Sequence, residues 1–325
     1  CGDIRNLVEG EYIDQENFKD LDLVVGGPPC QGFSMANRQR ILDDPRNELY
    51  KQFLKLLSST RPKFFLMENV RGMMNKVDEI TDNFKSELGK DYSIKMVLLN
   101  AKHYGVPQNR ERVFVIGTRL KNVDLDILID SILNKGSKMK QYVLKNALNS
   151  LPVLYPKTQK NKGGFENEKI GFKFRKINEK ETETDFLKFI GGSSEYITNH
   201  TNRYNNDRDV EIFSRLPQGA NSLHSSIVDI MPYSSRNNVF KDKYYKLKEN
   251  EVSKTITSHM KFDCNMYIHP HQARGLSPRE AARIQTFPDD YVFMGANNTW
   301  YAQIGNAVPV KLAEAIGEEI MKYLN

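Results

Sequence analysis

The chain has 325 residues, a length that suits two domains better than one. It contains no apolar run of about 18 residues such as a membrane helix needs. Its three cysteines are too few for a disulfide framework, and no signal peptide is visible. These features argue against a membrane protein and a disulfide-stapled secreted domain, and we expect a cytoplasmic location.

The net charge is +6, and the whole excess lies in the middle of the chain. Residues 121–265 hold 24 Lys and Arg against 18 Asp and Glu, whereas the rest of the chain holds 23 of each. Such an excess suits phosphates, because binding releases condensed counterions. A solvated lysine-rich surface is the alternative that charge alone leaves open.

In residues 1–120, short apolar runs alternate with helical patterns. Residues 1–4 have the character of a strand end; further strands are expected over 21–25, 63–67, 94–99 and 113–117, and helices over about 49–57 and 76–89. Strands separated by helices predict an α/β fold with a doubly wound, mostly parallel sheet that is covered on both faces.

Residues 121–265 lose this rhythm, and the end of the chain regains it. The middle is rich in lysine and glycine, which predicts an irregular, strand-containing insertion. The capping box Ser277-Pro278-Arg279-Glu280 predicts a helix through about Gln285, and Pro309 opens a final helix. We therefore expect one domain in two parts, 1–120 and 266–325, around an unlike inserted domain at 121–265.

Cys30 stands in the segment Gly26-Gly27-Pro28-Pro29-Cys30-Gln31-Gly32-Phe33-Ser34, directly after a predicted buried strand. In open α/β folds, ligands bind at this carboxyl edge of the sheet. Two prolines stiffen the turn, and two glycines let the backbone approach a ligand. Since thiolates are good nucleophiles when exposed and rigidly presented, Cys30 is predicted to be a nucleophile rather than a small buried cysteine.

Acidic and basic side chains follow at the same edge. Glu68-Asn69-Val70 comes after the strand 63–67, so Glu68 can face Cys30 and protonate a ring nitrogen; a helix cap is the alternative. Gln108-Asn109-Arg110-Glu111-Arg112 leads into the next strand. Because alternate residues of an extended chain point the same way, Arg110 and Arg112 are expected on one face, where they suit phosphate or a carbonyl oxygen. The alternative is that Arg110 and Arg112 are an ordinary pair of basic residues on the protein surface.

Together these segments resemble the DNA cytosine-5 methyltransferase family, in its bacterial restriction–modification form. The segments around Cys30, Glu68 and Arg110 look like its nucleophile motif, its acid motif and its Gln-x-Arg-x-Arg motif. Residues 274–280 through Phe287-Pro288 are similar to the segment that supports the recognition domain. Gln303-Ile304-Gly305-Asn306-Ala307-Val308-Pro309 looks like the motif that folds back on the cofactor. All five occur in the family's order.

The resemblance implies the S-adenosylmethionine-dependent methyltransferase fold, with a catalytic domain at 1–120 and 266–325 and a target-recognition domain at 121–265. It implies methyl transfer from S-adenosyl-L-methionine to carbon 5 of a cytosine flipped out of double-stranded DNA. The catalytic residues would be Cys30, Glu68, Arg110 and Arg112. The cofactor contacts would be Asp3, Ile4, Pro28, Leu49, Asn306 and Ala307, and the DNA contacts Gln31, Ser34, Arg38 and Arg40.

The sequence departs from the family at its beginning. It lacks the Phe-x-Gly-x-Gly turn that holds the cofactor, so we expect an N-terminal segment or a subunit that carries this turn, and a restriction endonuclease as a further partner. A metal site is not expected, because His269-Pro270-His271 with Cys264 lacks a fourth ligand, and Cys264 suits the core. A transfer-RNA cytosine methyltransferase and a non-catalytic DNA-binding subunit are the alternative functions.

Overall fold

The computed structural model of the chain describes residues 2–8, 18, 20–29, 47–159, 169–176, 184–191, 195–231 and 243–324. The chain folds as two compact units. Unit 1 comprises residues 1–100, 111–138 and 314–325, and unit 2 comprises residues 101–110 and 139–313. These bounds differ from the functional segments 1–120, 121–265 and 266–325, and that functional division stays a prediction.

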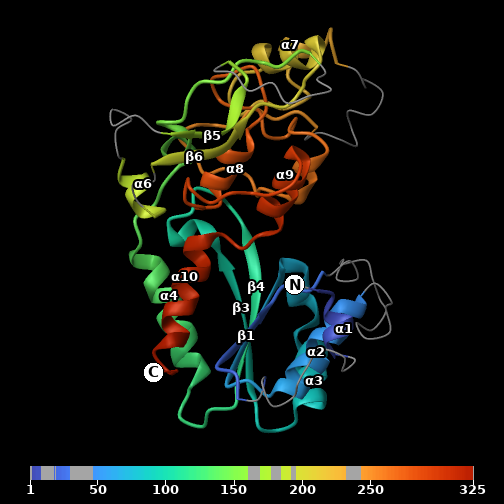
Figure 1. Ribbon diagram of the computed structural model, residues 1–325, viewed down its shortest axis with the longest axis vertical. Helices are drawn as coiled ribbons and strands as arrows, with labels where there is room; N and C mark the ends of the chain where they lie inside the picture. Colours follow the sequence, from blue (N-terminus) through green and yellow to red (C-terminus); the bar gives the residue numbers. More distant parts are fainter. Residues whose placement is uncertain are drawn as a thin grey trace. The chain divides into compact units, whose positions relative to one another are not determined.

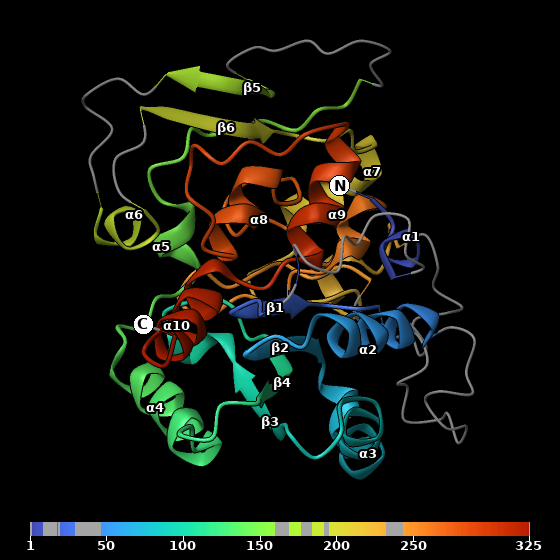
Figure 2. The same cartoon turned by 60° about the horizontal axis from the view of Figure 1, so that its bottom comes forward.

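Unit 1 is a sheet covered by helices on both faces. Its elements are α1 (Ile4–Val8), β1 (Leu23–Gly26), α2 (Glu48–Thr60), β2 (Phe64–Val70), η2 (Arg71–Lys76), α3 (Val77–Leu88), β3 (Ser93–Asn100), β4 (Glu111–Thr118), α4 (Leu125–Lys138) and most of α10 (Val310–Met321). Helices α2 and α3 cover one face of the sheet, and α4 and α10 cover the other (Figures 1 and 2). The α/β class is therefore confirmed.

The expectation of a mostly parallel sheet is wrong for the described strands. The order is β1-β2-β4-β3; β1 and β2 are parallel, whereas β4 is antiparallel to both of its neighbours. A parallel return needs a crossover of about a dozen residues or more. Only residues 101–110 connect β3 to β4. The chain therefore turns back directly, and β4 inserts between β2 and β3.

The start of the chain also differs from expectation. The described residues 2–4 do not end a strand; they lead into the helix α1. Asp3 explains this start, because its Oδ1 accepts a hydrogen bond of 2.9 Å from the backbone amide of Arg5. A carboxylate that binds a free amide is the usual way to begin a helix.

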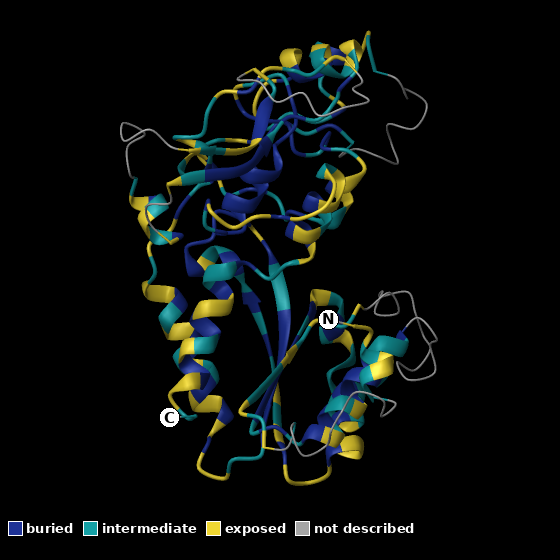
Figure 3. Cartoon of the chain, in the orientation of Figure 1, coloured by how far each residue is buried: buried dark blue, intermediate teal, exposed yellow. Residues whose placement is uncertain are grey.

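Alternation along the strands fills the core of unit 1. Phe65 and Met67 point to the face covered by α2 and α3, where the Phe65 ring stacks on Phe84 with centroids 4.9 Å apart. Gly117 lies opposite Phe65 in the register between β2 and β4. A Cβ at Gly117 would lie 2.0 Å from the Phe65 ring, so the aromatic side chain requires glycine here. Figure 3 shows β4 mostly buried and the outer faces of α4 and α10 exposed.

Unit 2 has short elements joined by long irregular segments. They are η3 (Ala101–Tyr104), α5 (Leu144–Leu148), β5 (Gly171–Lys176), α6 (Asp185–Phe189), β6 (Tyr196–Thr201), α7 (Asp207–Arg215), η4 (Ser225–Ile227), η6 (Ser258–Lys261), α8 (Pro278–Ile284) and α9 (Asn297–Asn306). Strands β5 and β6 form an antiparallel pair. The described part of 139–265 is thus irregular and contains two strands, and the inserted domain at 121–265 stays a prediction.

Helix α8 is the centre of unit 2 and begins as the sequence predicts. Ser277 and Glu280 form the capping box, and Pro278 occupies the first turn. Glu280 is buried and paired with Arg274. Burial alone would raise the pKa of Glu280, but Arg274 beside it holds that pKa below its ordinary value. None of the helices in the described parts of the chain is both long and apolar enough to cross a membrane.

We predict opposite effects for two glycine substitutions in unit 1. Gly117→Ala places a methyl group against the Phe65 ring and should lower the free energy of unfolding by about 1–3 kcal/mol. Gly317→Ala, in the middle of α10, meets no atom within 4 Å and should raise it by about 0.5–1 kcal/mol. Urea denaturation of both variants checks the signs. Equal stability of the two proteins would contradict the packing described for Phe65.

Candidate active site

The register of unit 1 brings an acid and a base together at the carboxyl end of β2. Strand β2 continues through Glu68, Asn69 and Val70, three residues beyond the expected end, because β4 supplies hydrogen-bonding partners there. Glu68 lies opposite Phe114, and Val70 lies opposite Arg112. Residues opposite and diagonal on the same face of a sheet are neighbours, so Arg112 is a diagonal neighbour of Glu68.

Glu68 and Arg112 form an ion pair with 2.8 Å between Arg112 Nε and Glu68 Oε1. Both side chains are about one-sixth exposed, at 16% and 15%. Burial lowers the pKa of the Arg112 guanidinium, and Glu68 beside it offsets part of that effect. Arg112 also donates to the Glu111 carbonyl at 2.7 Å. The pair is thus oriented, charged and still reachable from solvent.

The turn that leads to Cys30 starts beside this pair. Gly26 lies opposite Met67 in the parallel register of β1 and β2, so Gly27 comes next to Glu68. A Cβ at Gly27 would lie 3.3 Å from Glu68 Oε2. The Asn69 amide donates to the Pro28 carbonyl at 3.1 Å and fixes the turn. Cys30 itself and the expected DNA contacts Gln31, Ser34, Arg38 and Arg40 lie outside the described residues.

Arg110, the other arginine of the motif, has a different environment. It belongs to unit 2 and is 1% exposed. Its guanidinium donates to the carbonyls of Ile256 at 2.7 Å, Gly305 at 3.1 Å and Ala307 at 3.0 Å. These bonds tie Arg110 to backbone carbonyls, whereas Arg112 pairs with a carboxylate. Arg110 therefore holds together two segments of unit 2 that are far apart in the sequence.

Two buried glutamines complete this arrangement, and sequence reasoning gave neither of them a role. Gln108 Nε2 donates to Gln285 Oε1 at 2.8 Å, and Gln108 Oε1 accepts from the Ile256 amide at 2.7 Å. Gln285 Nε2 donates to the Ile304 carbonyl at 2.7 Å. Gln285 follows directly after α8, and a polar residue in an otherwise buried helix end is the signal that could have identified it.

The expected cofactor residues are divided between the two units. In unit 1, Ile4, Pro28 and Leu49 are half-buried, while Asp3 is exposed. Arg5 binds the Asp3 carboxylate and lowers its pKa to about 2. In unit 2, Asn306 is exposed at the end of α9 and Ala307 is half-buried. Gly305 fixes this turn, because a Cβ there would lie 2.2 Å from the Ser258 amide nitrogen.

The His-Pro-His segment has internal partners. His269 Nδ1 accepts hydrogen bonds from the amides of His271 at 3.0 Å and Gln272 at 3.1 Å, and burial lowers the His269 pKa to about 3. Cys264 is buried, which raises its thiol pKa. Within the described ranges, no group of three or more His, Cys, Asp or Glu side chains is arranged to hold a metal ion.

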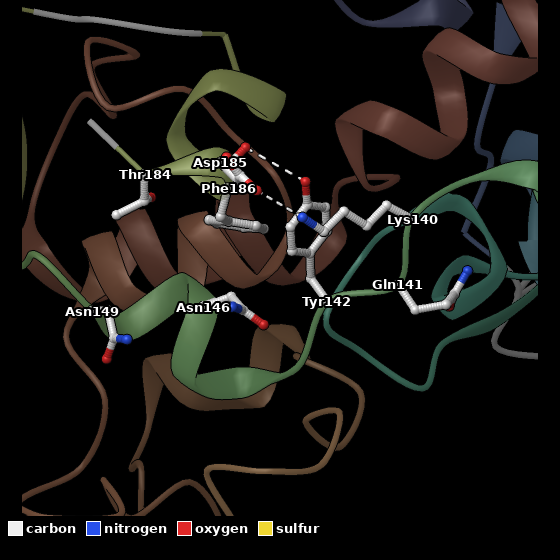
Figure 4. Close-up of a pocket in the computed structure, with 8 residues that line it drawn as sticks. All are labelled: Lys140, Gln141, Tyr142, Asn146, Asn149, Thr184, Asp185 and Phe186. Carbon is white, nitrogen blue, oxygen red and sulfur yellow. Dashed lines mark hydrogen bonds and ion pairs between the residues drawn. The ribbon is translucent and has the colours of Figure 1, made fainter. Parts of the chain in front are cut away.

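A small polar pocket of unit 2 lies among α5, α6 and the segment before α5 (Figure 4). Its volume is about 160 Å³, and the ion pair between Lys140 and Asp185, 2.7 Å apart, stands at its edge. Tyr142 donates to the Asp185 carbonyl at 3.4 Å. None of the residues expected to act in catalysis or cofactor binding lines it.

Known proteins match the chain over nearly its whole length. Residues 1–322 match the family model of the C-5 cytosine-specific DNA methylases. The type II methyltransferase M1.HphI of Haemophilus parahaemolyticus is 31% identical over 329 residues, which are 98% of this chain and 73% of that protein. The type II methyltransferase M.DdeI of Desulfomicrobium norvegicum is 32% identical over 340 residues, which are 99% and 77%.

The fold has a solved counterpart. A structure from E. coli, provisionally described as a DNA modification methyltransferase encoded within a prophage, superposes with a TM-score of 0.71 at 25% sequence identity. The alignment covers 100% of this chain and 85% of that one. The chain therefore belongs to the family of C-5 cytosine-specific DNA methylases, enzymes that take their methyl group from S-adenosyl-L-methionine.

Proposed function

We propose that the chain methylates carbon 5 of a flipped-out cytosine in a specific sequence of double-stranded DNA, through a covalent bond from Cys30 to carbon 6. The observation that carries this proposal is the pairing of Glu68 with Arg112 at 2.8 Å, beside the turn that leads to Cys30. Carbon 5 of cytosine is a weak nucleophile. The site must therefore activate the ring itself, and a thiolate, an acid and a guanidinium are suited to that task.

Each side chain has a separate role in this proposal. The Cys30 thiolate adds to carbon 6 and makes carbon 5 nucleophilic. Glu68, in its protonated form, binds N3 and the exocyclic amine and delivers its proton to N3 as the ring accepts electrons, which leaves the carboxylate beside Arg112. Arg112 binds the O2 oxygen and keeps Glu68 in place. After methylation, loss of the carbon-5 proton and of Cys30 restores the aromatic ring. The base must leave the duplex, because a stacked ring exposes neither face.

S-adenosyl-L-methionine supplies an electrophilic methyl group when it is bound. The residues present fit it by their chemistry: Ile4, Pro28 and Leu49 offer half-buried apolar surface for adenine, and Asp3 and Asn306 offer an exposed carboxylate and amide. Gly305 supports the fit, since its close packing on Ser258 fixes the turn that presents Asn306. We assign Asp3 and Ile4 to the adenine side and Asn306 and Ala307 to the methionine end.

Arg110 serves the same reaction as a positioning residue. Its bonds to the carbonyls of Gly305 and Ala307 keep the cofactor turn in place, and its bond to Ile256 ties that turn to the segment before η6. We therefore move Arg110 from the chemical step, where the sequence motif placed it, to the support of the cofactor turn. A misplacement of about 1 Å can cost roughly a hundredfold in rate, so such support matters.

The type II names of the similar proteins favour duplex DNA as the substrate, and we expect a cognate restriction endonuclease as the partner enzyme. The direct test measures transfer from labelled S-adenosyl-L-methionine to duplex DNA and, separately, to transfer RNA. Bisulfite sequencing of DNA from cells that express the gene with its native upstream region then locates the target. Transfer to transfer RNA alone, or to neither substrate, would overturn the proposal.

We predict that Cys30→Ala abolishes methylation while duplex binding persists, because the thiol supplies a covalent bond and not the phosphate contacts. Wild-type protein with cofactor should form a covalent complex with a duplex that carries 5-fluorocytosine at the target, since the fluorine at carbon 5 cannot leave as a proton does. A gel-resolved adduct that is absent in Cys30→Ala checks this. Methylation by Cys30→Ala would refute the mechanism.

We predict that Glu68→Gln lowers the methylation rate about a hundredfold or more, because the amide can still accept from Arg112 but cannot deliver a proton. Glu111→Gln is the matched control: its carboxylate pairs with Arg71 at 2.5 Å, one residue before Arg112 on the same strand. Single-turnover rates should be nearly unchanged for this control. Equal losses in rate for both variants would mean that the loss of one negative charge near Arg112 explains the effect. Such a result would contradict the role of Glu68 as a proton donor.

We predict that residues 121–265 determine the target sequence, because they hold the whole excess of positive charge and none of the motifs that resemble the catalytic ones. Exchanging this stretch for that of a relative with another target should transfer the relative's specificity. Bisulfite sequencing of DNA from cells that express the chimera reads the outcome. Retention of the original target by an active chimera would show that specificity lies elsewhere.

A further inference from the structure

Three residues around η6 form an exposed cluster that the proposed reaction does not use, which we call the aromatic platform: His259, Lys261 and Phe262. Phe262 is 65% exposed, and the His259 side chain is 61% exposed. The centroids of their rings lie 5.3 Å apart, and Lys261 Nζ lies 4.8 Å from the centre of the Phe262 ring. Single exposed apolar residues are ordinary on protein surfaces. Two adjacent exposed rings with a cation over one of them are a less common surface feature.

A half-buried arginine supports the backbone of this platform. The Arg203 guanidinium donates to three successive carbonyls, those of Met260 at 2.7 Å, Lys261 at 3.5 Å and Phe262 at 2.9 Å. It also lies over the Tyr301 ring at 5.6 Å and donates to Cys264 Sγ at 3.7 Å. One guanidinium therefore fixes the backbone of the platform. The exposed rings are presented by a rigid support, which lowers the entropy lost on binding.

The position of the platform in unit 2 relates it to the reaction. It follows directly after Ser258, the first residue of η6, whose amide nitrogen would lie 2.2 Å from a Cβ on Gly305. Gly305 starts the turn that presents Asn306, and Arg110 ties the same turn to Ile256, just before the platform. The platform and the cofactor turn are therefore parts of one hydrogen-bonded framework.

We propose that the aromatic platform contacts the DNA duplex at the place that the target cytosine leaves. This inference rests on the proposed function. Extrusion of a base leaves an unpaired partner and unstacked neighbours, whose ring faces are open to aromatic side chains. Phe262 and His259 stack on these faces, and Lys261 binds a flanking phosphate. The nearby Asp263 carboxylate, 3.9 Å from His259 Nε2, orients the imidazole.

The test measures duplex binding by the full chain with fluorescence anisotropy, on a duplex that contains the mapped target. Phe262→Ala should bind about 5- to 100-fold more weakly, as expected for the loss of stacking on one base. Phe262→Trp should retain binding, whereas Phe262→Leu should not. The control is Ile127→Ala on α4, an apolar residue of similar exposure at 60%, which should leave binding unchanged. Lys261→Ala should lower the slope of log Kd against log salt concentration by about the amount expected for one phosphate contact. Phe262→Ala should leave this slope unchanged.

A double-mutant cycle separates positioning by Arg203 from general stabilisation. If Arg203 acts by placing Phe262, Arg203→Lys should weaken binding in the wild-type background but should cause no further loss in the Phe262→Ala background. Additive losses, or binding by Phe262→Ala within about twofold of a wild-type protein that binds and methylates duplex DNA, would overturn the inference. A wild-type protein that neither binds nor methylates duplex DNA would instead overturn the proposed function and this inference with it.

Discussion

The chemistry depends on the insertion of β4 between β2 and β3. Because β4 runs antiparallel, its first residues lie beside the last residues of β2, and the register that pairs Val70 with Arg112 also makes Arg112 a diagonal neighbour of Glu68. The parallel register of β1 then brings Gly27 to the same point. A slip of one residue would turn Arg112 to the opposite face of the sheet. Strand pairing, more than any loop, thus sets the geometry of the acid and the guanidinium.

Unit 2 meets a different physical requirement, since irregular backbone leaves many buried carbonyls without the partners that regular structure provides. Buried arginines supply them. Arg279 donates to the carbonyls of Thr198 and Pro288, Arg283 to that of Asn149, and Arg110 to three carbonyls. A guanidinium offers five donors in a fixed plane, so one side chain can hold segments that no strand or helix connects. These hydrogen bonds also offset the free-energy cost of removing the charged guanidinium groups from water.

Local patterns predicted several elements in both units, because apolar alternation and capping residues act over short distances. The strand at 94–99 and the capping box at Ser277 are examples that the structure bears out. The direction of β4 could not be predicted from its composition, since it depends on the length of a connection. Nor could spacing reveal the partners of Gln285, which come from residues about 20 to 177 positions away in the chain.

Arg110 and Arg112 show where motif reasoning ends. They lie two residues apart on an extended segment and have the same chemistry, so the motif alone could not separate their roles. What separates them is the set of acceptors within reach: three backbone carbonyls for Arg110 and a carboxylate for Arg112. A buried guanidinium that donates to three backbone carbonyls is suited to holding structure. One that shares a partly exposed carboxylate can change its partner when a substrate oxygen arrives. Within five consecutive positions, Gln108 to Arg112, one segment thus provides both the buried contacts that hold unit 2 together and the partly exposed ion pair of unit 1.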